Sequence, residues 1–297
     1  MSLSAYKNCR LCQRKCGINR NENIGYCKMS SDMYIARAAL HHWEEPPISG
    51  RQGSGAIFFS GCSLKCVYCQ NREISRGRTG KCVTIDRLSE IMLNLQNEGA
   101  HNINLVTPTH YIPSVAEAIK QARLSGLTVP VVYNTASYDT PEALGFLDGL
   151  INIYLPDLKY FSSKTAHSYS DAEDYPVRAR EAIAEMYRQV GEAEFDENGM
   201  MKKGMIVRIL LLPGHTAEAM LSLKYLHETY GDKIFVSLMN QYTPPEGMTS
   251  PLNRRVTHEE YERLVDYAER IGLKNGFIQQ YGTAEESFIP PFDLTGV

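Results

Sequence analysis

The chain has 297 residues and a formal net charge of −3, with a sequence pI near 6.3. That length allows one large domain with a small one, and the acidic balance argues against a nucleic-acid-binding protein. The N-terminus lacks the apolar core of a signal peptide, and no stretch approaches about 18 consecutive apolar residues. We therefore expect a cytoplasmic protein that binds neither nucleic acid nor membranes, with its eight cysteines kept reduced as metal ligands.

The first feature along the chain is a group of four cysteines separated by two, three and ten residues. This group, called the N-terminal cysteines below, consists of Cys9, Cys12, Cys16 and Cys27. Four thiolates complete a closed coordination sphere, which suits zinc or a fully ligated iron–sulfur cluster, and the spacing leaves both open. A segment this short has little core and needs such a staple. We predict a metal-binding segment and linker over residues 1–50, with Trp43 anchoring the linker, and a second domain over residues 51–297.

The next feature is a compact loop, GCSLKCVYCQN, with three residues between its first two cysteines and two between the next pair. These residues, called the cysteine loop below, include Cys62, Cys66 and Cys69. Such a loop can place three thiolates on three corners of an iron–sulfur cube, whereas zinc usually takes two separated pairs and a fourth ligand. One iron then stays open to a substrate or cofactor. The alternative is part of a zinc site in a protein that only binds a partner.

After the cysteine loop, short β-rich runs alternate with helical patterns, as expected for repeated βα units around a parallel sheet. We expect strands at Ala56–Ser60, Ile103–Val106, Val129–Tyr133, Ile151–Leu155, Met205–Leu211, Ile234–Leu238 and Phe277–Gln280. About six such units fall short of the eight of a closed barrel. The fold class is therefore α/β, an open partial barrel whose ligand site lies at the carboxyl ends of its strands.

Local signals support these elements. Apolar residues at helical spacing predict buried stripes over residues 88–95 and 261–268. A capping box at Thr257 predicts the start of the second of these helices. The polar run 192–204 predicts an exposed hairpin or loop, and Cys82, isolated from both cysteine groups, is expected to be a small buried hydrophobe.

These motifs resemble the radical S-adenosylmethionine (SAM) enzymes, in which an aromatic residue such as Tyr68 precedes the third cysteine of the loop. The closer resemblance is to proteins similar to the pyruvate formate-lyase activating enzyme, in the branch with an N-terminal four-cysteine segment. The matching segments span essentially the whole chain and read CRLCQRKCGINR, HHWEEPPISG, GSGAIFFSGCSLKCVYCQN, NLVTPTHYIP, YLPDLKY and SLMNQYTPP.

The resemblance implies a partial (β/α)6 radical SAM barrel with a 4Fe-4S cluster on the cysteine loop and SAM chelating the open iron. It also implies a strongly reducing electron donor such as flavodoxin or ferredoxin. Reductive cleavage of SAM would yield a 5'-deoxyadenosyl radical that removes a hydrogen atom from the substrate. The implied substrate is a backbone glycine of a partner enzyme, and a small molecule or a peptide side chain remains an alternative.

The resemblance also implies roles for single residues. Tyr68 would lie against the adenine of SAM, and Asp157 and Lys159 match a strand end that lies beside SAM. A solvated ion pair is the alternative for the last two. Asn134 and Thr135 match an Asp-Thr pair that helps bind a monovalent cation, and the asparagine here leaves a neutral hydrogen-bonding role equally open.

A second departure from the family pattern follows the strand at 103–106, where a Gly-Gly-Glu stretch is replaced by Thr-Pro-Thr-His. Oxygens of Thr107 and Thr109 can accept from the SAM ammonium group. His110 is open to three readings: a proton donor, a substrate contact or a hydrogen-bonded loop histidine. Arg208 can pair with the SAM carboxylate or form a structural ion pair inside the barrel.

Overall fold

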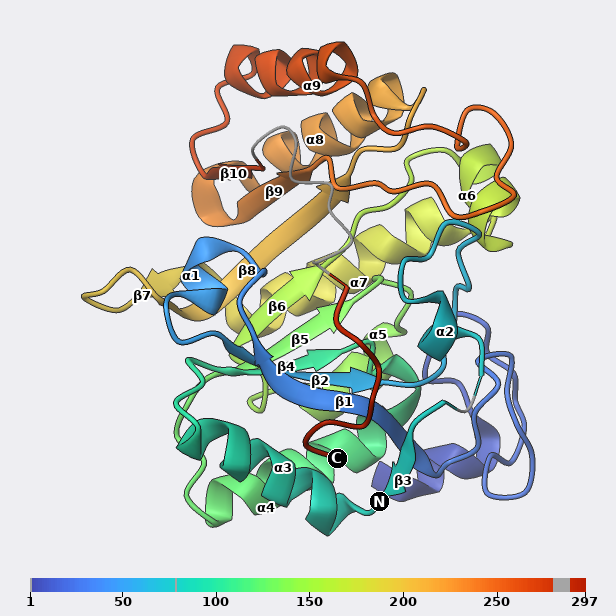
Figure 1. Ribbon diagram of the computed structural model, residues 1–297, viewed down its shortest axis with the longest axis vertical. Coiled ribbons are helices and arrows are strands. Elements are labelled where there is room, and N and C mark those ends of the chain that lie inside the picture. The colour runs from blue at the N-terminus through green and yellow to red at the C-terminus, as the bar shows by residue number, and fades with distance from the viewer. Residues whose placement is uncertain (1, 78, 280–288) are drawn as a thin grey trace.

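The computed structural model describes residues 2–77, 79–279 and 289–297, and among them ten strands form one curved sheet (Figure 1). The strand order is β10-β9-β8-β6-β5-β4-β2-β1-β3, with β7 paired to β8. The strands are β1 (Met33–His41), β2 (Ser54–Phe59), β3 (Lys81–Val83), β4 (Ile103–Val106), β5 (Val131–Thr135), β6 (Ile153–Pro156), β7 (Glu194–Phe195), β8 (Met201–Leu210), β9 (Phe235–Met239) and β10 (Gly276–Ile278).

The strands from β2 to β10 in this order all pair in parallel, as the βα pattern predicted. β4 and β6 are buried along their whole length, because a parallel sheet is covered on both faces. Within the described residues β10 pairs only with β9, so the sheet is open. The predicted α/β partial barrel is therefore confirmed. Gln280, the end of the last predicted strand, lies outside the described residues.

Helices follow the strands and cover the outer face of the sheet, where α3 packs on α4 and α8 on α9 (Figure 1). The helices are α1 (Pro46–Ser49), α2 (Arg72–Ser75), α3 (Ile85–Asn97), α4 (Ile112–Leu124), α5 (Pro141–Leu144), α6 (Ser163–Ser170), α7 (Tyr175–Val190), α8 (Thr216–Tyr230) and α9 (His258–Arg270), with 3-10 turns η1 (Ser2–Asn8), η2 (Thr109–Tyr111), η3 (Gly145–Leu147) and η4 (Gly231–Lys233). The predicted apolar stripes face the core from α3 and α9, and the capping box at Thr257 is present. No described helix has the length and apolar character needed to cross a membrane.

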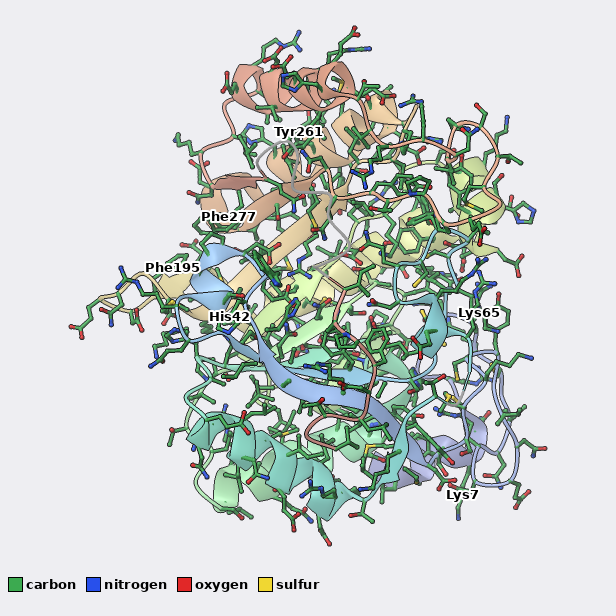
Figure 2. The ribbon with its side chains drawn as sticks, viewed as in Figure 1. Lys7, His42, Lys65, Phe195, Tyr261 and Phe277 are labelled. Carbon is green, nitrogen blue, oxygen red and sulfur yellow. The ribbon has the colours of Figure 1, made fainter. Side chains whose placement is uncertain are left out.

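Two sequence predictions concern the edges of the sheet. The predicted hairpin over 192–204 is confirmed, with β7 antiparallel to β8 and Phe195 on its projecting part (Figure 2). The expectation that Cys82 is buried was wrong, since its side chain is exposed. It lies in β3, a short edge strand whose only described neighbour is β1, so its outer face meets solvent.

The sheet extends into the range predicted for the N-terminal segment and linker, because β1 lies antiparallel to β2. The C-terminal tail, residues 289–297, runs along β1 (Figure 1). The Ala38 N–H donates to the Thr295 carbonyl at 2.8 Å. Gly296 has a φ of 75°, and a Cβ there would lie 2.0 Å from the Ala38 oxygen. Only glycine permits this close approach.

Candidate functional site

A cavity of about 550 Å³ lies at the carboxyl ends of the parallel strands. Its walls include Thr107 after β4, Thr135 at the end of β5, Asp157 after β6 and Met239 at the end of β9. The cysteine loop follows β2 and forms another wall. The site therefore lies at the edge of the sheet where parallel βα units place their ligands.

Alternate residues of the cysteine loop face the cavity. Cys62, Leu64, Cys66 and Tyr68 line it, as does Cys69, while the residues between the first four do not. The turn into the loop needs a glycine, because a Cβ on Gly61 would lie 2.3 Å from the Met29 side chain. The N-terminal segment thus packs directly against the base of the cysteine loop.

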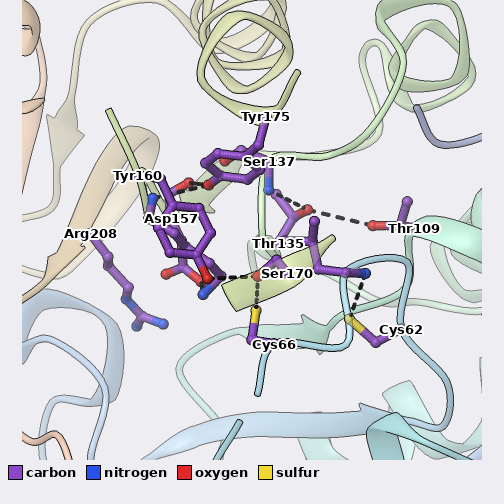
Figure 3. A network of polar contacts seen from close by, with 12 residues as sticks. Cys62, Cys66, Thr109, Thr135, Ser137, Asp157, Tyr160, Ser170, Tyr175 and Arg208 are labelled. Carbon is purple, nitrogen blue, oxygen red and sulfur yellow. Dashed lines mark hydrogen bonds and ion pairs between the residues drawn. The ribbon is translucent and has the colours of Figure 1, made fainter. Parts of the chain in front are cut away.

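Hydrogen bonds reach two of the three sulfurs (Figure 3). The Ser170 hydroxyl donates to Cys66 Sγ at 3.0 Å and lies 2.6 Å from the Tyr160 hydroxyl. Leu64 N–H donates to Cys62 Sγ at 3.4 Å. Burial, and then the neighbouring Cys66 and Cys69 thiols, raise the pKa of Cys62 to about 12. Cys66 is buried, and Cys62 and Cys69 are half-buried. Three crowded thiols in such a place can ionise together only against a cation, which fits a metal cluster.

Binding of a metal cluster by the cysteine loop would require a change in the orientation of its thiols. Across residues 2–77, 79–279 and 289–297, no three His, Cys, Asp or Glu side chains are already grouped as metal ligands. A cluster would therefore require the thiols of the loop to turn toward a common centre. The position and burial of the loop suit this, since all three cysteines border the same cavity.

Tyr68, the predicted adenine neighbour, is buried in an aromatic group at the cavity wall. Its ring centroid lies 6.3 Å from those of Tyr160 and Tyr169 and 6.1 Å from that of Tyr242, all in edge-on arrangements. These contacts hold the ring in one orientation beside the cysteine loop.

Asp157 and Lys159 both line the cavity and pair with each other, with Lys159 Nζ 2.5 Å from Asp157 Oδ2. Burial lowers the pKa of Lys159, but Asp157 together with Tyr68 and Cys66 outweighs burial and holds that pKa well above its usual value. The Tyr175 hydroxyl donates to the Asp157 carbonyl at 2.9 Å and accepts from the Lys159 N–H at 3.0 Å. The pair is mostly buried and firmly positioned, so a solvated surface pair does not describe it.

Thr107, Asn134 and Thr135 also line the cavity. The Thr135 hydroxyl donates to Asp139 Oδ2 at 2.5 Å, and Asp139 is fully buried. Burial raises the pKa of this carboxyl, while hydrogen bonds from Thr135 and Tyr133 lower it in part. Asp139 was not predicted as a site residue, because its only signal in the sequence is a carboxylate four residues after a predicted site threonine.

Thr109 and His110 lie behind the cavity wall, in η2. The Thr109 hydroxyl is 3.5 Å from that of Thr135. His110 Nε2 is 2.7 Å from the Ser60 carbonyl oxygen. Burial, with Arg20 nearby, lowers the pKa of His110 to about 3, so the ring is neutral at pH 7. The geometry favours the hydrogen-bonded loop histidine among the three readings.

Arg208 lines the cavity within a buried ion-pair group. Its Nε donates to Glu45 Oε1 at 2.8 Å and its Nη2 to Glu45 Oε2 at 2.5 Å, with a further bond to Glu44. The structural ion pair is thus present. Glu44 and Glu45 were predicted to belong to the linker and not to the site. The ring of Trp43, which was expected to anchor the linker, is 58% exposed at the cavity rim.

The N-terminal cysteines do not line the cavity but lie beside the base of the cysteine loop. Next to them Arg20 is fully buried, and its guanidinium donates to carbonyl oxygens and lies 3.9 Å from Cys9 Sγ. Among the described residues no carboxylate pairs with Arg20. Burial lowers the pKa of Arg20, but the negative charge of Cys27 and Cys9 opposes burial, and the net effect is a raised pKa. A buried cation without a carboxylate fits a group of thiolates that carries excess negative charge on a metal.

Comparison with known proteins identifies the family. The model of the radical SAM superfamily matches residues 56–226. An uncharacterised protein of Methanocaldococcus jannaschii is 28% identical over 279 residues, covering 90% of this chain and 76% of that protein. The crystal structure of Streptococcus suis SuiB bound to precursor peptide SuiA matches with a TM-score of 0.50 at 15% identity, over 74% of this chain and 46% of that chain. SuiB bound to S-adenosylmethionine matches at 15% identity with a TM-score of 0.48, over 74% of this chain and 48% of that chain.

This chain spans about half the length of the SuiB chains that it matches. At 15% identity the likeness to SuiB bound to SuiA concerns the fold alone. The superfamily match, in contrast, covers more than half of the chain and includes the cysteine loop and strands β4, β5, β6 and β8. The chain belongs to the radical SAM superfamily.

Proposed function

We propose that this chain reductively cleaves SAM at a 4Fe-4S cluster held by Cys62, Cys66 and Cys69, and removes a hydrogen atom from a substrate in the cavity. The observation that carries the proposal is the convergence of these three cysteines on one cavity at the carboxyl ends of the strands. Membership of the superfamily implies the cluster and SAM as cofactors. When bound, these cofactors supply a 5'-deoxyadenosyl radical.

The residues of the chain would bind and orient SAM. Asp157 and Lys159 offer a carboxylate and an ammonium that complement the amino acid moiety and ribose hydroxyls of SAM. Thr107, Asn134 and Thr135 offer neutral donors and acceptors on the adjacent strand ends, with a monovalent cation at the last two as the alternative. The buried walls around them exclude water that would quench a radical.

Arg208 contributes less to SAM binding in this proposal, because of its ion pairs with Glu44 and Glu45. Its guanidinium already satisfies two carboxylates, so contact with the SAM carboxylate would require it to share or give up one of them. We propose that it mainly holds Glu44 and Glu45 in the cavity wall.

For the substrate we propose a polypeptide, and first a backbone glycine of a partner enzyme, as the resemblance to the activating enzymes implies. An apolar rim supports a polypeptide, since Trp43 is 58% and Ile278 51% exposed where both border the cavity. A peptide side chain or a small molecule is the alternative. Deuterium transfer from a candidate peptide labelled at glycine into 5'-deoxyadenosine tests this, and transfer only from side-chain-labelled peptide would reject the glycine.

The central test uses protein purified and reconstituted without oxygen. Dithionite should drive formation of 5'-deoxyadenosine and methionine from SAM, and an alanine at Cys62, Cys66 or Cys69 should abolish it. The matched control is Cys82→Ala, which removes an exposed thiol outside both groups. Persistent cleavage in all three loop variants would reject the assignment. Colourless protein that contains zinc and no iron would instead support a zinc-binding interaction protein.

We further propose that the N-terminal cysteines bind a second metal, either zinc or an iron–sulfur cluster. The buried Arg20, which has no carboxylate partner among the described residues, supports this, as does Gly25, where a Cβ would contact Cys27 Sγ at 3.5 Å and Cys16 Sγ at 3.7 Å. The division of the chain near residue 50 is kept as a proposal for this metal-binding unit, with β1 adding a strand to the larger domain. Iron, sulfide and zinc analysis of Cys12→Ala next to Cys82→Ala tests the site.

A further inference from the structure

The N-terminal segment concentrates positive charge in an otherwise acidic chain. Residues 1–28 contain six lysines and arginines and one glutamate, while the whole chain has a net charge of −3. Lys15 and Lys28 are exposed, and each adjoins one of the N-terminal cysteines. The sulfurs of those two cysteines, Cys16 and Cys27, both lie near Gly25. The two lysines therefore flank the same part of the segment.

The cysteine loop adds to this charge. Lys65 lies on the outside of the molecule beside the N-terminal segment (Figure 2). Its Nζ is 4.0 Å from the Tyr26 ring centroid, and the Arg14 guanidinium carbon is also 4.0 Å from that centroid. Lys65 thus joins the loop to the segment through Tyr26, and Arg14 of the segment lies over the same ring. Lys28 and Arg14 also lie within electrostatic range of Lys65.

We call this surface the basic face, and it consists of Arg14, Lys15, Lys28 and Lys65. One carboxylate is present in the same region, because the Tyr26 hydroxyl donates to Asp171 Oδ2 at 3.3 Å. The cations nevertheless outnumber it. Lys15 and Lys28 are exposed, and Arg14 and Lys65 are half-buried beside them. Cations at a surface attract an acidic surface over about a Debye length, roughly 8 Å at physiological ionic strength.

A partner protein can approach the cysteine loop from one side only. On one side the loop borders the cavity, which SAM and substrate must fill under the proposed function. Lys65 is not part of that wall, and neither are Lys15 and Lys28. A protein that delivers an electron to the loop must therefore come from the other side. That side presents the basic face.

We propose that the basic face docks an acidic one-electron carrier protein, of the flavodoxin or small ferredoxin kind, that reduces the metal centre of the cysteine loop. This proposal rests on the proposed function. The carrier loses one electron and the centre gains one, and no covalent bond forms or breaks. Charge complementarity of this type mainly raises the rate of encounter and makes it sensitive to salt.

The binding experiment compares two double variants of the reconstituted protein with the same change in charge. Lys15→Glu/Lys28→Glu alters the basic face, whereas Lys224→Glu/Lys233→Glu alters α8 and η4. Titration calorimetry with oxidised flavodoxin, and separately with oxidised ferredoxin, gives the Kd at low and high salt. We expect about tenfold weaker binding and a weaker salt dependence for the first variant only. Equal Kd values for both variants, or no binding of either carrier to the unmodified chain, would overturn the proposal.

Activity separates this proposal from the function on which it rests. SAM cleavage driven by reduced carrier should fall about tenfold in Lys15→Glu/Lys28→Glu, while cleavage driven by dithionite stays near the unmodified level. Equal metal content in the two variants shows that the altered segment is intact, and Lys15→Gln/Lys28→Gln replaces the first variant if its metal is lost. Failure of dithionite in the unmodified chain would reject the radical SAM function itself. Equal carrier-driven rates in both variants would reject only the docking.

Discussion

Replacing Arg208 tests whether the cavity wall depends on a buried cation. Arg208→Met removes the guanidinium and leaves Glu44 and Glu45, whose side chains are 9% and 6% exposed, without their positive partner. Breaking a buried pair in this way costs about 3–5 kcal/mol. Because one kcal/mol shifts the melting temperature of a domain of this size by about 2–4 °C, we expect a loss of roughly 10 °C at pH 7.

The loss should depend on pH, with a sign that follows from Glu45. Burial raises its pKa, but Arg208 outweighs that effect and holds the pKa below its usual value of 4.5. A carboxyl with a depressed folded pKa contributes stability above its unfolded pKa, and that contribution is lost as pH falls through the folded value. The difference between the two proteins should therefore shrink from pH 7 toward pH 4, where the carboxyls of the variant take up protons.

Anaerobic urea unfolding followed by far-ultraviolet circular dichroism at pH 7 and pH 4.5 measures both effects. The matched control is Arg188→Met, since Arg188 also pairs with two carboxylates but is 57% exposed. Its unfolding midpoint should be almost unchanged. A loss below about 1 kcal/mol for Arg208→Met, or one that does not vary with pH, would refute the structural role and return Arg208 to SAM binding.

Three further predictions concern the cofactor sites. Asp157→Asn should weaken SAM binding by about one to two decades, since a charge-assisted hydrogen bond contributes roughly 1.5–3 kcal/mol, with the iron content unchanged. Calorimetric titration with SAM measures this affinity. An unchanged affinity in both Asp157→Asn and Lys159→Ala would show that these two residues do not bind SAM. Single alanine variants of the N-terminal cysteines should lose metal and melt earlier, because a closed thiolate site contributes about 10 kcal/mol; an unaltered metal content and melting temperature would show that no site exists. Ser170→Ala should make the reduction potential of the loop cluster more negative, because it removes a hydrogen bond to Cys66 Sγ. Redox titration measures this potential, and the control is Ser89→Ala, which changes a buried serine of α3. Equal potentials in the two variants would contradict the prediction.

The fold was predictable because its signals are local. Each parallel strand is a short apolar run followed by a helical stripe, so counting them indicated an open sheet. β1 was harder to predict, since it pairs antiparallel with β2 from within the range that was assigned to a metal-binding segment and linker. The exposure of Cys82 was also not predictable from the sequence. A thiol suits a core and an edge strand alike, and only the pairing of β3 decides its exposure.

The site could be predicted where one motif carries the chemistry and not where distant residues meet. Cys62, Cys66 and Cys69 share a short loop, so their spacing alone indicated a common metal. The pairing of Arg208 with Glu45 joins residues 163 positions apart. No sequence period marks such a contact, because it depends on where β8 passes the end of β1.

The pairing of the C-terminal tail with β1 has a consequence during synthesis. β1 leaves the ribosome long before residue 295, so Ala38 meets its partner Thr295 only after all the residues between them have been made. Contacts this far apart in sequence form late and carry a high entropy of closure. The edge of the sheet beside β1 therefore stays incomplete while the rest of the barrel assembles, and a chaperone or another chain can pair with it during that interval.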